Sequence, residues 1–420
     1  MFEITPRTAA NVAIVLLIVR WISQLGLEWL NTRNVLDHAG DVPESFRNLI
    51  DPAAYKRSVQ YTLAKSRFRC VELTCDLAVL FFVLFSGFLP AGLKLFAHAF
   101  GSDATSMASF LFVSGLFLTI TSLPFDWYAQ FHLEEHFGFN TTTPKVWWLD
   151  RGKGVLLAAV LGYPLLVLIL VIVQWTGSNW WLWAWAVVLG FQFLVVLLAP
   201  VFILPLFNKF SPLPEGTLRQ RLLELADRTK FRASSIQVMD GSKRSRHSNA
   251  FFTGFGRFRK IVLFDTLIQH LAEVELEAVL AHEIGHFKKK HIPKMLLWGA
   301  ATQFVGFFVL ARLARQDWFY TAFGFQPGNV AVALLLFALP SGIITFWFTP
   351  IANLWSRRFE YQADAFAAKV MKESVSLICA LRKLNEKNLS NLTPHPIYSG
   401  FYYSHPTLLE REDALLKASN

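Results

Sequence analysis

Long apolar stretches alternate with polar segments along this chain. A helix that crosses the hydrocarbon core of a bilayer needs about 20 predominantly apolar residues. We therefore expect seven transmembrane helices, with the polar segments between them outside the bilayer. The apolar stretches lie at 9–30, 76–100, 106–124, 154–176, 180–206, 294–314 and 327–352.

The polar segment 207–293 is the one long stretch expected to fold as a soluble unit. Leu218, Leu222 and Leu225 recur at helical spacing, whereas two later runs are short and rich in β-branched residues. The predicted elements are a helix at 215–230, strands at 235–240 and 260–268, a third candidate strand at 249–255, and a helix at 271–290.

The predicted fold class is an α-helical integral membrane protein with seven transmembrane helices and a separate α+β domain. Its predicted divisions are 1–206 with transmembrane helices one to five and the polar loops 31–75 and 125–153, then 207–293 with the soluble segment, 294–352 with helices six and seven, and 353–420 as a polar tail.

Composition supports this picture and gives it an orientation. Hydrophobic residues make up 54% of the 420 residues and charged residues 17%, against about 25% in soluble domains. Of the 40 Lys and Arg residues, 34 lie in 31–75, 125–153, 207–293 and 353–420. Positive charge favours the cytosolic side, so these segments are expected in the cytosol and the N-terminus outside. The net charge of +10 therefore reflects topology, and no nucleic-acid partner is expected.

The candidate chemistry lies in histidine and carboxylate residues. The three cysteines are odd in number and match no zinc-finger spacing. In His282-Glu283-Ile284-Gly285-His286, the two histidines are four residues apart on a predicted helix and share a face. They can bind one metal ion, and Glu283 can take a proton from a metal-bound water. A surface helix with two ordinary histidines is the alternative.

A second pair of residues could complete such a site. A catalytic zinc ion uses three protein ligands and leaves a position for water. Glu360 and Asp364 are also four residues apart, so one can bind the metal while the other orients a ligand histidine. The helices at 294–314 and 327–352 form an out-and-back hairpin that returns the chain to the cytosolic face. An exposed acidic face beside two arginines is the alternative for this pair.

Five sequence elements, in this order, resemble the type I CAAX prenyl endopeptidases, the membrane zinc proteases that mature prenylated a-factor and prelamin A. Together with the seven apolar stretches, they cover most of the chain. They are FHLEEHFGFN at 131–140, RHSNAFFTGF at 246–255, HEIGH at 282–286, SRRFEYQAD at 356–364 and HPTLLER at 405–411.

The resemblance implies a role for each matching residue. It implies one zinc ion per chain with His282, His286 and Glu360 as its ligands and Glu283 as the general base. Asp364 would contact one of the ligand residues without binding the metal, and Asn249 would bind the substrate backbone. His405 and Arg411 would line the site opposite the base. It also implies that the helices surround a large chamber with a zincin-like domain at its cytosolic end.

The expected function is proteolysis near the C-terminus of prenylated or other membrane-associated proteins. The chain is expected to act as a monomer in the bilayer of the endoplasmic reticulum or the bacterial inner membrane. One alternative is a quality-control metalloprotease of the heat-shock type, which has about four spans and lacks the GFNTTTP loop. The other is a non-catalytic membrane chaperone, which would not need Glu283.

Two expectations concern other polar residues. Glu134 and Glu135 are expected to hold arginines from the 31–75 loop rather than to form an acid–base pair. His291 follows a run of three lysines and is expected at the membrane interface.

Overall fold

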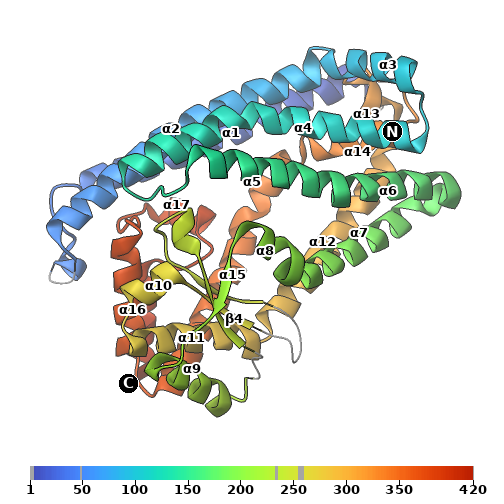
Figure 1. Ribbon diagram of the computed structural model, residues 1–420. Coiled ribbons are helices and arrows are strands. Elements are labelled where there is room, and N and C mark those ends of the chain that lie inside the picture. Colours follow the sequence, from blue (N-terminus) through green and yellow to red (C-terminus); the bar gives the residue numbers. More distant parts are fainter. Residues whose placement is uncertain (1–3, 48–49, 232–234, 254–259, 420) are drawn as a thin grey trace.

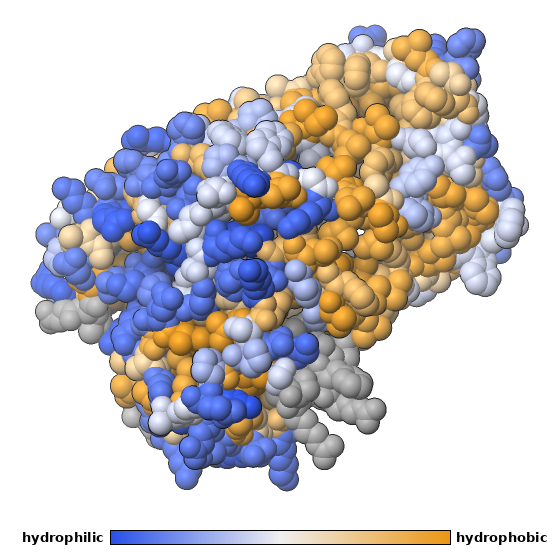
Figure 2. All heavy atoms as spheres, viewed as in Figure 1, coloured by the Kyte–Doolittle hydropathy of each residue, from blue (hydrophilic) through white to orange (hydrophobic). Residues whose placement is uncertain are grey.

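The molecule consists of a long bundle of helices and a smaller domain in which helices surround a sheet (Figure 1). This is a computed structural model that describes residues 4–47, 50–231, 235–253 and 260–419. The C-terminus lies in the smaller domain, whereas the N-terminal end lies at the far end of the bundle (Figure 1). Hydrophobic residues gather on the surface of that far end, and hydrophilic residues cover much of the remainder of the visible face (Figure 2).

The bundle is formed by helices from two parts of the chain. The N-terminal part supplies α1 (Pro6–Asp37), α2 (Pro52–Phe85), α3 (Phe88–Phe100), α4 (Ala104–Tyr128), α5 (Pro144–Leu157), α6 (Tyr163–Thr176), α7 (Trp180–Leu198) and α8 (Leu204–Phe207). The later part supplies α12 (His291–Leu313), α13 (Asp317–Thr321), α14 (Val330–Ala338) and α15 (Ser341–Met371). A π-helical segment, η2 (Ala129–Glu134), extends α4.

Several bundle helices could cross a membrane. By length and composition, the described residues contain four such helices, or up to six if each of two bent pairs is one span. The bent pairs are α2 with α3, at 53°, and α14 with α15, at 47°. Gly87, which separates α2 from α3, has a φ of 78°, a left-handed conformation that glycine adopts without steric cost.

This number of possible spans, four to six, counts residues 144–207 as one helical stretch of 64 residues. A straight helix of that length would measure roughly 96 Å, about three times the hydrocarbon thickness of a bilayer. The stretch instead reverses at Gly177, whose φ is 56°, so that α6 and α7 pack against each other. Figure 1 shows them as a hairpin at the edge of the bundle. The sequence had predicted two separate transmembrane helices here.

The smaller domain contains a four-stranded sheet in the order β1-β2-β4-β3. β2 and β4 are parallel, and the two outer pairings are antiparallel. The strands are β1 (Phe210–Pro212), β2 (Ser235–Met239), β3 (Ala250–Thr253) and β4 (Lys260–Phe264). The helices are α9 (Thr217–Arg228), α10 (Asp265–His270), α11 (Glu273–Lys288), α16 (Val375–Lys387), α17 (Pro396–Tyr402) and α18 (Leu408–Ser419).

The predicted strand at 260–268 is wrong in its second half, and β1 was not predicted. β4 ends at Phe264, and α10 begins at Asp265. The Asp265 carboxylate accepts hydrogen bonds from the backbone N–H groups of Ser242 and Thr266, each at 2.9 Å, and the Thr266 N–H is one of the donors that the start of α10 leaves free. Of the predicted third strand, Gly254 and Phe255 lie outside the described residues.

α11 is buried at the centre of the smaller domain. Its side chains Leu276, Leu280 and Ile284 are at most 2% exposed and join a core shared with α9 and α16. The opposite side of α11 packs along α15. Gly285 makes this close approach possible, because a Cβ atom there would lie 3.0 Å from the Cα atom of Ala363. The two helices that carry the candidate residues are therefore in direct contact.

Candidate metal centre

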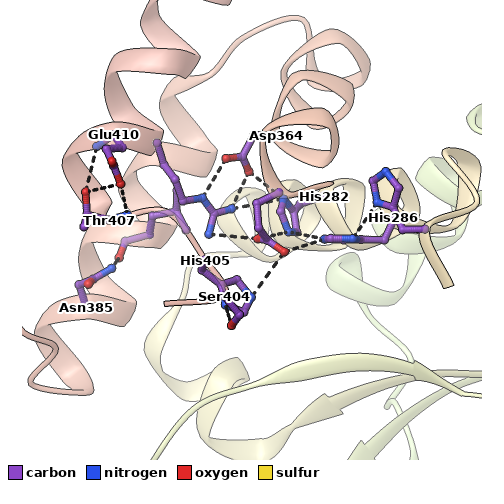
Figure 3. A network of polar contacts seen from close by, with 12 residues as sticks. His282, His286, Asp364, Asn385, Ser404, His405, Thr407 and Glu410 are labelled. Atoms are coloured by element: carbon purple, nitrogen blue, oxygen red, sulfur yellow. Dashed lines mark hydrogen bonds and ion pairs between the residues drawn. The ribbon is translucent and has the colours of Figure 1, made fainter. Parts of the chain in front are cut away.

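The two histidines of the HEIGH motif lie one turn apart on α11 and point to the same place (Figure 3). Their Nε2 atoms are 3.1 Å apart. His282 is 7% exposed, and the His286 side chain is 22% exposed. The helical spacing that the sequence predicted therefore brings two imidazole nitrogens to one point at the edge of the core.

Glu360 on α15 completes a cluster of three potential ligands. Its carboxylate oxygens lie 3.5 Å from Nε2 of His282 and 3.3 Å from Nε2 of His286. Atoms bound about 2.1 Å from a tetrahedral zinc ion are roughly 3.4 Å apart, so the spacing fits such an ion. Among the residues described, Oε2 of Glu360 is buried and has no hydrogen-bond partner. A bound cation would satisfy that oxygen.

Asp364 lies behind His282, on the side away from the cluster. One carboxylate oxygen is 2.8 Å from Nδ1 of His282, so Nδ1–H can donate to it and leave Nε2 free for a metal. Arg411 of α18 donates two hydrogen bonds to the same carboxylate, at 2.8 and 2.5 Å. Arg411 is 9% exposed, so this charge pair lies in the interior. The pair holds the His282 ring in one orientation.

Glu283 directly follows His282 on α11 and so lies between the two histidines in the sequence. Burial raises the pKa of this carboxyl, whereas the nearby His282 and His286 lower it. A carboxylate with a raised pKa accepts a proton more readily near neutral pH than an exposed one. The environment of Glu283 therefore suits a general base.

His405 and Arg411 reach the cluster from the C-terminal tail. Nε2 of His405 is 3.5 Å from Oε1 of Glu360, and its side chain is 63% exposed. Nη1 of Arg411 is 3.8 Å from Oε2 of Glu360. Both residues line a cavity of about 1110 Å³ that extends to residues of α1 and α2, among them Glu28 and Lys65. The tail thus forms part of the wall between the candidate centre and this cavity.

Asn249 lies immediately before β3, the strand at one end of the sheet order. Its backbone oxygen accepts a hydrogen bond from Phe264 N, and its side-chain oxygen accepts one from Ala250 N. In the part of the chain that the structure describes, β3 pairs only with β4, so its other edge could receive an extended peptide. Among the contacts of the described residues, Asn249 makes no hydrogen bond or ion pair with His282, His286 or Glu360.

Glu134 has partners other than the predicted arginines. It accepts a hydrogen bond from the Tyr61 hydroxyl at 2.6 Å and one from Nε2 of His247 at 3.3 Å. Glu135 accepts one from the side-chain amide of Asn140. The FHLEEHFGFN segment is therefore joined to the RHSNAFFTGF segment, and Glu134 and His247 both line the cavity. His247 belongs to that second motif, but the motif alone did not indicate this contact.

His291 has a contact that the sequence did not predict. It was expected at the membrane interface, and the structure shows that it is 1% exposed, with its Nδ1 atom 3.0 Å from Nδ1 of His286. The sequence contained one signal, a histidine five residues after the motif. Its significance depends on the turn between α11 and α12, which no periodicity predicts.

Comparisons with known proteins show the family of this chain. The family model described as "CAAX prenyl protease N-terminal, five membrane helices" matches residues 31–209, and that of "Peptidase family M48" matches residues 212–419. CAAX prenyl protease 1 of Saccharomyces cerevisiae is 37% identical over 403 residues, covering 89% of this chain and 88% of that protein. The CAAX prenyl protease 1 homolog of Homo sapiens is 31% identical, covering 91% of this chain and 90% of that protein.

A solved structure has the same fold. The crystal structure of S. mikatae Ste24p superposes with a TM-score of 0.90 at 34% sequence identity, covering 97% of this chain and 98% of that one.

Proposed function

Because this chain belongs to peptidase family M48, with CAAX prenyl protease 1 relatives along nearly its whole length, we propose that it cleaves CAAX-type prenylated proteins near the C-terminus. The chain is a multi-pass membrane metalloendopeptidase. The observation that carries the proposal is the cluster of His282, His286 and Glu360, whose ligand atoms all lie within 4.8 Å of one another.

Zinc is the metal that suits this donor set. Two imidazole nitrogens and one carboxylate oxygen form a common ligand set of catalytic zinc, with a fourth position for water. One ion per chain is expected, held by His282, His286 and Glu360. When bound, zinc lowers the pKa of a coordinated water and polarises the scissile carbonyl group.

Glu283 is the general base of the proposed reaction. It accepts a proton from the attacking water while the new C–O bond forms at the carbonyl carbon. It then delivers this proton to the amine nitrogen as the C–N bond breaks, so the carboxylate is regenerated. Because Glu283 is on the same helix as His282 and His286, it stays beside the two histidines during both proton transfers.

Other residues bind the substrate and stabilise charge. His405 can donate a hydrogen bond to the oxyanion that develops on the carbonyl oxygen. Arg411 adds positive charge nearby and, through Asp364, orients His282. The segment beginning at Asn249 presents the free edge of β3 to the peptide backbone.

The cavity beside the centre suits a peptide that arrives from the membrane. Its lining combines polar and apolar surface, and the polar residues there include Glu28, Lys65, Glu134 and His247. A cavity with polar groups in its wall can hold the last residues of a substrate away from the bilayer. We place the soluble catalytic segment 207–293 and the tail 353–420 in the cytosol, and we assign seven spans, counting α6 and α7 as two and each bent pair as one.

The alternative functions have less support. The relatives found are CAAX prenyl proteases along most of their length, which does not favour a quality-control protease of the heat-shock type. A non-catalytic chaperone would have no need of the partly buried Glu283 beside His282 and His286.

The proposal is tested with a farnesylated CAAX peptide and its unfarnesylated twin. Purified protein is incubated with each, and the products are identified by mass spectrometry. We expect release of the C-terminal tripeptide, faster from the farnesylated peptide. The Glu283→Gln variant, purified identically, controls for contaminating proteases. Cleavage by that variant at the wild-type rate, or no cleavage of either peptide by the wild type, would contradict the proposal.

A further inference from the structure

His291 lies against the metal centre because the chain reverses sharply before α12. Lys290, the residue before it, has a φ of 56°, a left-handed conformation that is unfavourable for a residue with a side chain. This turn brings the first residue of α12 back over the last turn of α11. His291 is 1% exposed there, and its ring stacks on Phe359 with the ring centres 4.2 Å apart. A strained turn and a buried polar ring at one place need an explanation.

Both ring nitrogens of His291 are within hydrogen-bond distance of a partner. Nδ1 is 3.0 Å from Nδ1 of His286, and Nε2 is 3.0 Å from Oε1 of Gln362. Gln362 belongs to α15, which also carries Glu360 and Asp364. Three helices therefore meet through this chain of contacts, which leads from α15 through the start of α12 to the end of α11.

With the carbonyl oxygen of Gln362 toward His291, the contacts set where the hydrogens lie. The carbonyl oxygen of Gln362 can only accept, so Nε2 of His291 carries a hydrogen. Nδ1 of a neutral His291 is then an acceptor, and Nδ1 of His286 must donate to it. His286 consequently has a bare Nε2, which is the atom 3.3 Å from Glu360. This is the tautomer that metal coordination needs.

The opposite arrangement would prevent metal binding. If Gln362 presented its amide NH₂ group, His291 would accept at Nε2 and donate from Nδ1. His286 would then accept at Nδ1 and carry its hydrogen on Nε2, in the position of the metal. Only the arrangement with Gln362 as acceptor is compatible with a ligand at His286.

From this geometry, and relying on the proposed zinc site, we propose that His291, held by Gln362, is a positioning residue that fixes the tautomer and ring orientation of His286. It does for His286 what Asp364 does for His282. α15 thus orients both ligand histidines, one directly and one through His291.

The test measures zinc affinity rather than turnover. Full-length protein is purified in detergent, and its zinc dissociation constant is obtained by competition with a chelating indicator. His291→Phe keeps an aromatic ring on Phe359 but removes both nitrogens. We expect its dissociation constant to rise about 10–100-fold, the usual cost of removing a residue that supports a metal ligand. An unchanged dissociation constant would overturn the proposal.

Matched variants separate the hydrogen-bond role from a packing role. His291→Asn places a carbonyl oxygen near the position of Nδ1, so zinc affinity should stay within about threefold of wild type. Gln362→Glu keeps an acceptor and should bind zinc normally, whereas Gln362→Lys offers only a donor and should weaken binding like His291→Phe. If His291→Asn bound zinc as weakly as His291→Phe, the acceptor role would be wrong.

These outcomes are distinguishable from failure of the proposed function. Zinc binding by the wild-type protein, with normal affinity in His291→Phe, would refute this inference alone. Failure of the wild type to bind zinc at all would refute the proposed metalloprotease site itself. The absorption spectrum of the cobalt-substituted protein gives a second readout, since a misplaced His286 changes the ligand field.

Discussion

At the scale of single residues, the site depends on how each histidine is held rather than only on its presence. Asp364 accepts from Nδ1 of His282, and Arg411 fixes Asp364 in turn. His286 contacts the buried His291 in the equivalent position. Such partners set which nitrogen is free to bind a metal.

Glu283 provides the most direct test of the reaction. Replacement of Glu283 by Gln keeps the shape of the side chain but removes the proton acceptor. We expect the turnover number to fall by about 10²–10⁴-fold, the typical contribution of a general base. Zinc content, measured by elemental analysis, should stay near one per chain. Turnover equal to wild type would exclude Glu283 as the base.

The pH dependence of zinc binding follows from His282. Burial on its own would lower the pKa of His282, but its contacts with Asp364 and Glu360 raise this pKa to about 9. Zinc binds Nε2 only after the proton leaves, so proton and metal compete. In protein stripped of metal by a chelator, we expect zinc affinity to rise about tenfold per pH unit from pH 7 to about 9 and then to level off. Indicator competition at several pH values measures this, and a flat profile would contradict it.

The same pKa shift also predicts how the stability of the metal-free protein changes with pH. The pKa of His282 is raised in the folded state from its ordinary value of 6.5 to about 9. The stabilisation that it provides is therefore complete below about pH 6.5 and is lost as the pH rises through about 9. The melting temperature of the metal-free protein should fall between about pH 6.5 and 9, and added zinc should remove this dependence on pH.

At the scale of elements, the contact between α11 and α15 is decisive. α11 carries the two histidines, and α15 carries Glu360 and the residues behind them. Gly285 sits where the two helices touch, with room for a hydrogen atom but not for a methyl group. A small change in this packing would move Glu360 relative to the two histidines.

Gly285→Ala tests this contact. The added Cβ would lie 3.0 Å from Ala363 Cα and 3.1 Å from its carbonyl oxygen, so the backbone has to shift. We expect a loss of about 1–3 kcal/mol in unfolding free energy, as for other overpacked cores, together with weaker zinc binding. Thermal unfolding and indicator competition measure the two effects.

Gly299→Ala in α12 is the matched control. A Cβ at Gly299 would meet nothing within 4 Å. Alanine favours the helix over glycine by roughly 0.5–1 kcal/mol, so this variant should be as stable as wild type or more so, with normal zinc affinity. Equal behaviour of the two variants would show that the close approach at Gly285 is unimportant.

At the scale of the whole molecule, distant parts of the chain return to one place. The HEIGH helix α11, the C-terminal half of the bundle helix α15 and the tail helix α18 all contribute to the site. The reversal at Gly177 and the bends at α2–α3 and α14–α15 shape the bundle that supports them.

The orientation of the bundle can be tested with reporters. With seven spans and the N-terminus outside, a reporter fused after Asn420 should read as cytosolic, because most positive charge lies on that side. A reporter inserted at Ser178, in the turn between α6 and α7, should read as external. Protease protection and glycosylation reporters measure both. An external C-terminal reporter would correspond to an even number of spans and would contradict the topology.

Sequence reasoning worked where the signal is local. The apolar stretches, the helix at 271–290 and the i, i+4 spacings of His282–His286 and Glu360–Asp364 depend on residues within a few positions of one another. It was less successful at 260–268, where a helix start interrupted a run of apolar residues that also suits a strand. The bend between α2 and α3 was also not predicted, because the conformation of Gly87 decides it.

The order of neighbouring residue types was sufficient to predict a membrane protein and a helix whose two histidines could share a metal ion. Three contacts could be found only in the three-dimensional arrangement: Arg411 with Asp364, His247 with Glu134, and His291 with His286. These contacts join residues on different elements, and their geometry depends on how close the helices pack. Gly285 lets α11 approach α15 closely, and the left-handed turn at Lys290 brings the start of α12 to α11. Neither separation can be obtained from a local sequence pattern.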